Sequence, residues 1–143
     1  MKKKKSKEIQ IVNGRPVWPP MKNQIKGAIR RIFRLSPWMK LSLQKARVEK
    51  PKVLKDGSVS KKPDVYYRCT MCLGEFKLKD VQVDHIVPVV PIERTLQEMS
   101  YDEIVDRIFC GLDNLQVLCK SCHDIKTKNE KKNKAGKLST TPP

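Results

Sequence analysis

The spacing of hydrophobic residues predicts two helices in the first third of the chain. Apolar side chains recur there every three or four positions, which places them on one face of a helix. They are Met21, Ile25, Ala28, Ile29, Ile32 and Phe33. Ser36 followed by Pro37 is typical of an N-cap and a first helical position, so a second helix is expected from Pro37 to about Val48.

Polar segments flank and follow these helices. Residues 1–20 contain four consecutive lysines and three prolines, which predicts a disordered or extended arm. Residues 50–63 contain Asp56-Gly57 and further turn formers, which predicts a linker or a flexible hairpin. Residues 129–143 are basic and polar, and we expect a flexible tail there.

Short strand-like segments and one capped helix occupy the region between. Val65–Tyr67 is strand-like, and a second strand is expected from Val81 to about Val87, ended by Pro88 and Pro91. Ser100 and Glu103 have the spacing of a capping box. Four apolar residues behind it, Ile104, Val105, Ile108 and Phe109, predict a buried helical stripe. This mixture of elements predicts a small α+β fold.

Four of the five cysteines form two C-x-x-C pairs, Cys69 with Cys72 and Cys119 with Cys122. Two intervening residues let both thiolates of a pair reach one tetrahedral zinc ion, and Gly74 suits the positive φ of such a turn. The chain shows no signal-peptide or membrane-spanning stretch, so we expect a reducing, cytoplasmic compartment, where cysteines more often bind metal than pair. A thioredoxin-like redox role is the alternative. Cys110 has no partner spacing and is expected to be buried in the capped helix.

Basic charge is concentrated at the two ends of the chain. The net charge is +16 overall, made up of +16 in residues 1–68, −4 in residues 69–123 and +4 in residues 124–143. Basic flanks of this kind favour nucleic acid over a membrane surface, because no apolar anchor or lipidation signal is present. One helical stripe, Lys22, Lys26, Arg30 and Arg34, is a candidate DNA contact or a solvated face.

A zinc ion held by four thiolates is coordinatively closed, so any chemistry needs a second site. The candidates are Asp84, His85, Asn114 and His123, which include both histidines of the chain. Together with the cysteines they give the pattern C-x2-C-x11-D-H-x28-N-x8-H, in which the second C-x2-C pair ends one residue before the last histidine. Each also has a structural interpretation: a strand-end carboxylate, a core histidine, a turn former, and a helix residue or substitute zinc ligand.

This pattern resembles the HNH (ββα-metal) endonuclease family, in particular its zinc-containing members from bacteriophages and bacterial restriction systems. The resemblance covers about residues 66–127. It implies a ββα-metal domain over residues 65–128, preceded by a basic helical DNA-binding region and linker over residues 21–64. It also implies hydrolysis of phosphodiester bonds in double-stranded DNA, by nicking or double-strand cleavage, which leaves 5′-phosphate and 3′-hydroxyl ends.

The resemblance also implies a role for each candidate residue. His85 would be the general base, and Asn114 would hold the loop that carries it. Asp84 and His123 would bind one catalytic ion, Mg²⁺ or Mn²⁺ with tolerance for Ni²⁺ or Zn²⁺, while the four cysteines hold structural Zn²⁺. Lys126 and Thr127 would contact a phosphate or lie at a solvated helix end. Among phage relatives, work beside a packaging terminase is one role; the oligomeric state stays open.

Two other classes of protein share some of these features. A non-catalytic zinc-ribbon DNA-binding protein would have the same cysteines and basic flanks but would not need Asp84, His85 and His123. An RNA-binding zinc protein is less favoured, because few aromatic residues are placed to stack on unpaired bases.

Overall fold

A computed structural model describes residues 11–16 and 20–138 of the 143-residue chain. Most of the predicted N-terminal arm, residues 1–10 and 17–19, lies outside the described residues. Within it, β1 (Ile11–Val12) and β2 (Arg15–Pro16) form an antiparallel hairpin, which differs from the disordered or extended arm that we expected. Asn13 and Gly14 take φ values of 51° and 73°, as a tight two-residue hairpin turn requires.

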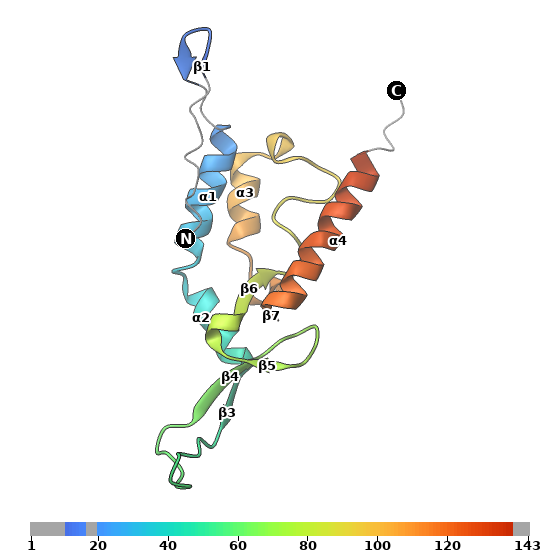
Figure 1. The fold of residues 1–143 in the computed structure, drawn as a ribbon. Helices are drawn as coiled ribbons and strands as arrows, with labels where there is room; N and C mark the ends of the chain where they lie inside the picture. The colour runs from blue at the N-terminus through green and yellow to red at the C-terminus, as the bar shows by residue number, and fades with distance from the viewer. Residues whose placement is uncertain (1–10, 17–19, 139–143) are drawn as a thin grey trace.

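The predicted N-terminal helices are α1 (Met21–Phe33) and α2 (Pro37–Ala46). Helix α1 packs beside α3 (Tyr101–Ile108), and the main core lies where these helices meet the loops between them (Figure 1). The buried core residues are Phe33, Val89, Leu96, Met99, Ile104, Ile108 and Leu115. Only part of the predicted α1 face is buried, because Met21 and Ile32 remain more than 60% exposed.

Helix α2 ends at Ala46, two residues before the predicted end, because the chain then enters a strand. Strands β3 (Arg47–Lys50), β4 (Asp64–Arg68) and β5 (Glu75–Phe76) form an antiparallel sheet in the order β3-β4-β5. Residues 50–63 form the end of the β3–β4 hairpin, which projects from the body of the protein (Figure 1).

A second sheet pairs β6 (Val81–His85) with β7 (Leu115–Cys119), and α4 (Lys120–Leu138) follows β7 without a loop. The register places Asp84 opposite Gln116 and His85 opposite Leu115. This is the expected ββα unit. Its helix is longer than predicted, because residues 129–138 continue α4 instead of forming a flexible tail.

The segment between β6 and β7 contains α3 and three-residue 3₁₀ turns at Leu96–Glu98 and Leu112–Asn114. A third such turn, Leu78–Asp80, precedes β6.

The predicted capping box is only half formed: Ser100 Oγ accepts from the Glu103 N–H at 3.1 Å, but the Glu103 carboxylate binds Arg94. The complete capping box is formed by Thr95 and Glu98. The predicted stripe on α3 is also half correct. Ile104 and Ile108 are fully buried, but Val105 and Phe109 are 38% and 39% exposed.

Among the described residues, no helix has the length and apolar character needed to cross a membrane.

Candidate metal centre and active site

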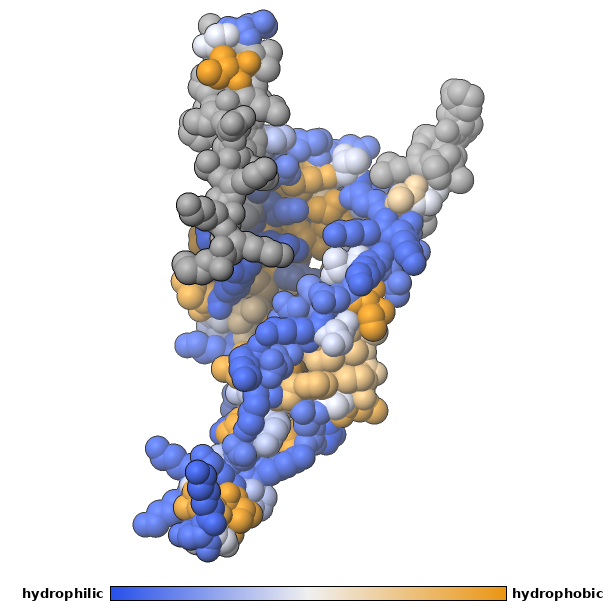
Figure 2. Space-filling model, in the orientation of Figure 1, coloured by the Kyte–Doolittle hydropathy of each residue, from blue (hydrophilic) through white to orange (hydrophobic). Residues whose placement is uncertain are grey.

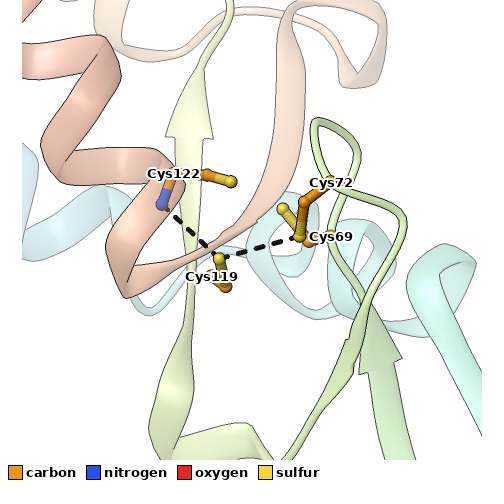
Figure 3. A group of neighbouring side chains, drawn as sticks. All are labelled: Cys69, Cys72, Cys119 and Cys122. Atoms are coloured by element: carbon orange, nitrogen blue, oxygen red, sulfur yellow. Dashed lines mark hydrogen bonds between the residues drawn. The ribbon is translucent and has the colours of Figure 1, made fainter.

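The four paired cysteines converge on one point (Figure 3). Cys69 and Cys72 follow β4, Cys119 ends β7, and Cys122 lies in the first turn of α4. Their sulfur atoms all lie within 4.8 Å of one another, and the Cys72 and Cys119 sulfurs are 4.0 Å apart. Two thiolates on a tetrahedral zinc ion with bonds of about 2.3 Å lie about 3.8 Å apart. The cluster therefore fits a metal ion such as zinc.

Backbone hydrogen bonds shape the turn that carries the first cysteine pair. The Cys69 N–H donates to the Gly74 carbonyl at 2.8 Å, and the Leu73 N–H donates to the Cys69 carbonyl at 2.9 Å. The prediction of a positive φ at Gly74 is wrong, because Leu73 takes that conformation, with φ of 60°. An added Cβ at position 74 would lie 2.8 Å from the Phe76 ring, so a larger residue there would have to displace that ring.

Two of the four thiols, Cys69 and Cys122, have pKa values shifted strongly in opposite directions. Burial raises the pKa of Cys69, but backbone hydrogen bonds from Cys72, Cys119 and Met71 outweigh this and lower it to about 6. Contacts with the Cys119 sulfur, burial and the remaining cysteines raise the pKa of Cys122 to about 12. Several thiolates cannot share this small volume without a cation, because like charges at such distances repel strongly. A divalent ion removes the repulsion, which agrees with a closed four-thiolate metal site.

Cys110 lies outside this cluster. It follows α3, is half-buried against the core, and burial raises the pKa of its thiol. As expected, Cys110 takes no part in the cluster. It differs from the prediction in being only half-buried and in lying just after the helix.

Asp84 and His123 form a second polar cluster. Asp84 lies near the end of β6 and His123 in the first turn of α4, and His123 Nε2 is 3.7 Å from Asp84 Oδ1. Bonds of about 2.1 Å place two ligands of an octahedral ion about 3.0 Å apart at right angles and about 4.2 Å apart when opposite. The observed separation of 3.7 Å is within about 0.7 Å of the right-angle spacing, so a small adjustment of the two side chains would bring both groups to one divalent ion.

Lys126 fixes the other oxygen of Asp84. Its ammonium lies 2.8 Å from Asp84 Oδ2, 2.9 Å from the His85 carbonyl and 2.5 Å from Glu130 Oε1. Burial disfavours the charge on Lys126, but its hydrogen bonds to Asp84 and Glu130 outweigh burial and raise its pKa. Lys126 is thus not a free cation at a solvated helix end. It orients Asp84.

The imidazole of His85 is held in one orientation. Its Nε2 lies 2.9 Å from the Ile108 carbonyl at the end of α3, and its ring packs against Phe33 of α1 at 5.4 Å between centroids. A carbonyl oxygen only accepts hydrogen bonds, so Nε2 carries the proton in the neutral ring. Nδ1 is then the basic nitrogen.

Asn114 clamps the chain directly after His85. Its Oδ1 accepts from the Val87 N–H at 2.8 Å, its Nδ2 donates to the Val87 carbonyl at 3.4 Å, and its own carbonyl accepts from the Ile86 N–H at 2.9 Å. The side chain therefore determines the path of the segment that leaves β6.

Three of the four candidate residues, all except Asn114, border a hollow of about 510 Å³, which we call the site hollow. Asp84, His85 and His123 line it together with Arg30 and Arg34 of α1, and apolar residues complete its walls. A neighbouring hollow of about 380 Å³, the α1–α4 hollow, shares Arg30, Asp84 and His85 with it.

The four residues of the predicted basic stripe on α1 lie in different environments. Arg30 and Arg34 line the site hollow, and Lys26 and Arg30 line the α1–α4 hollow. Lys22 instead donates to the carbonyls of Gln97 and Met99 at 2.6 and 2.7 Å, which ties α1 to the segment before α3. Sequence reasoning also missed two cations of the α1–α4 hollow, Lys131 and Lys134, because it treated this part of the chain as a tail.

The chain is a small mixed α/β protein in which two paired antiparallel strands are followed directly by a helix. Together with the four-cysteine cluster, this arrangement is consistent with an HNH-type ββα-metal fold. A curated relative from Lactococcus phage SK1, named "Probable HNH endonuclease", is 39% identical over 71 residues. The match covers 49% of this chain and 64% of the relative, so the chain spans somewhat less than two thirds of that protein. No protein-family model and no solved structure matches the chain. The relative and the cysteine cluster confirm the resemblance to the HNH family that the sequence predicts.

Proposed function

We propose that this protein is a metal-dependent HNH endonuclease that hydrolyses phosphodiester bonds in double-stranded DNA. The observation that carries the proposal is the Asp84–His123 pair, which shares one arginine-lined hollow with an oriented His85. The phage relative and the concentration of positive charge support the same conclusion. A cytoplasmic location in the host cell would bring such an enzyme to its substrate.

Asp84 and His123 would hold one divalent ion, Mg²⁺ or Mn²⁺, with tolerance for Ni²⁺ or Zn²⁺. Such an ion would supply positive charge that neutralises the oxygens of the scissile phosphate and stabilises the leaving 3′-oxygen. His85 Nδ1 accepts a proton from the attacking water, and the Ile108 carbonyl stabilises the imidazolium that forms by accepting from Nε2. Arg30 and Arg34 face the same hollow and favour the approach of the phosphate.

The four cysteines would hold a structural Zn²⁺ that is separate from the catalytic ion. Four thiolates leave no coordination position for water, so this ion would act on folding alone. It would connect the turn after β4 to the junction of β7 and α4, where His123 directly follows Cys122.

One observation favours the non-catalytic alternative, a zinc-ribbon DNA-binding protein. The charge of Asp84 is already balanced by Lys126, as in an ordinary structural ion pair. The chemistry of the product distinguishes the two functions. Hydrolysis as proposed leaves 5′-phosphate and 3′-hydroxyl ends, so a DNA ligase should reseal the nicks made in a plasmid, whereas a binding protein would make none.

Replacement of either proposed ligand should raise the metal requirement of the reaction. Asp84→Ala or His123→Ala removes one of only two protein ligands, so we expect the Mn²⁺ concentration for half-maximal cleavage to rise at least about tenfold, as loss of supporting contacts at metal sites already does. Excess Mn²⁺ should restore part of the rate. Titration of Mn²⁺ against cleavage rate tests this, and rescue of His85→Ala alone would show that the roles are reversed.

Asn114 should act as a positioning residue. Asn114→Ala removes the acceptor for the Val87 N–H and frees the segment after His85, so we expect kcat to fall about 10- to 100-fold, by analogy with other groups that orient a site residue. Asn114→Asp keeps that acceptor and should retain most of the activity. Single-turnover cleavage rates of the two variants provide the comparison, and equal losses would argue against positioning through Oδ1.

A further inference from the structure

The α1–α4 hollow is strongly basic and adjoins the candidate active site. Five cations line it, and the only carboxylates among its lining residues are Asp84 and Glu130. The cations are Lys26 and Arg30 of α1 and Lys126, Lys131 and Lys134 of α4. Figure 2 shows hydrophilic residues along nearly the whole length of α4.

The two carboxylates do not neutralise this cluster, because Lys126 already binds both of them. Lys26, Arg30, Lys131 and Lys134 form no ion pair with any carboxylate in the described part of the chain. Two cations from each helix therefore border one hollow without an ion pair, and the one carboxylate whose pKa the charge of Lys134 lowers, Glu98, does not line the hollow.

The charges of two of these cations, Arg30 and Lys134, act on a third, Lys26. Burial, followed by the neighbouring charges of Arg30 and Lys134, lowers the pKa of Lys26. Helices that are far apart in sequence thus hold like charges together at some cost in free energy. A bound polyanion would offset that cost.

We infer that the α1–α4 hollow binds the phosphodiester backbone of the DNA strand next to the scissile phosphate. The position relative to the cut rests on the proposed function, because Arg30, Asp84 and His85 line both this hollow and the site hollow. Lysine ammonium groups suit phosphate as point charges without reading base sequence. Pro88, Val90 and Ile92, which are only partly buried, offer an apolar surface to the sugars.

Helix α4 supplies a matched control for this inference. Lys131 and Lys134 line the hollow, whereas Lys128 and Lys132 are exposed on the same helix and line neither the hollow nor the site hollow. Lys131→Ala/Lys134→Ala and Lys128→Ala/Lys132→Ala each remove two charges from α4, and alanine preserves helix propensity. A general effect of net charge would alter both variants equally.

The test is duplex DNA binding over a range of salt concentrations, with each pair of substitutions placed in a His85→Ala background so that the DNA stays intact. Loss of two phosphate contacts should reduce the slope of log K against log salt by about 1.8 and weaken binding about tenfold or more at low salt. We expect this for Lys131→Ala/Lys134→Ala, and a clearly smaller change for the control pair. Equal changes in both variants, or none in either, would overturn the inference.

Failure of the inference can be separated from failure of the proposed function. The binding assay does not depend on catalysis, so the slopes report on the hollow even if the wild-type protein cuts no DNA. Conversely, a wild-type protein that cleaves DNA while both variants bind alike would retain the proposed function and lose only this binding site. Thermal unfolding of each variant confirms that the comparison is between folded proteins.

Discussion

Replacing His85 by alanine should abolish DNA cleavage while the protein stays folded and still binds DNA. Loss of a general base alone costs about 10²- to 10⁴-fold in rate. His85 contributes a half-buried ring that packs on Phe33 and one hydrogen bond to the Ile108 carbonyl, so its removal should cost modest stability. The four-cysteine cluster and the basic surfaces are untouched by this change.

The measurement is the single-turnover cleavage rate on a labelled duplex, alongside thermal unfolding and DNA affinity. Ile86→Ala, at the next position and 45% exposed, is a control for disturbance of the chain after β6. If His85→Ala cuts at the wild-type rate, the assignment of the general base is wrong. A loss of cleavage that coincides with unfolding would show a structural role instead.

Loss of one cysteine of the cluster should unfold much of the protein. Structural zinc sites contribute about 10–16 kcal/mol of apparent binding free energy at neutral pH, which is comparable to or larger than the total stability of about 5–15 kcal/mol of a typical domain. Cys69→Ser and Cys122→Ser should therefore lose both the bound zinc and cooperative unfolding. The wild-type protein should retain about one zinc ion per chain.

Cys110→Ser is the matched control, because Cys110 is the one cysteine outside the cluster. It should retain its zinc and unfold close to the wild-type temperature. Elemental analysis for zinc and circular dichroism during heating give the two readouts. Normal folding of Cys69→Ser without zinc would contradict the structural role of the cluster.

Features that depend on local sequence could be predicted well. The C-x-x-C spacing identified the four clustered cysteines, and apolar periodicity with the Ser36-Pro37 start identified α1 and α2. These signals lie within a few residues of the element that they predict, and no distant contact overrides them.

Features that depend on distant contacts could not be predicted. Arg47–Lys50 contains a single apolar residue and becomes a strand because it pairs with β4. Residues 129–138 were missed for a different, local reason: they carry almost no apolar signal, and they are helical as the continuation of α4, supported by the i,i+4 pair of Lys126 and Glu130.

The roles of individual basic residues were the least accessible to sequence reasoning. Lys22 donates hydrogen bonds to carbonyls more than 70 residues away in sequence. The charge of Lys134, more than 100 residues from Lys26 in sequence, lowers the pKa of Lys26. Lys126 lies where the sequence predicts a phosphate contact, but the fold places it on Asp84. Charge patterns alone do not distinguish such residues from a DNA-binding surface.

The proposed hydrolysis of DNA requires a divalent ion at Asp84 and His123. The most direct measurement is the conversion of supercoiled plasmid to open-circular or linear DNA by the zinc-loaded wild-type protein, with and without added Mn²⁺. We predict conversion with Mn²⁺ and none without it or with Asp84→Ala/His123→Ala. A plasmid that stays supercoiled at all Mn²⁺ concentrations, although the protein is folded and binds it, would contradict this proposal and favour the non-catalytic DNA-binding protein.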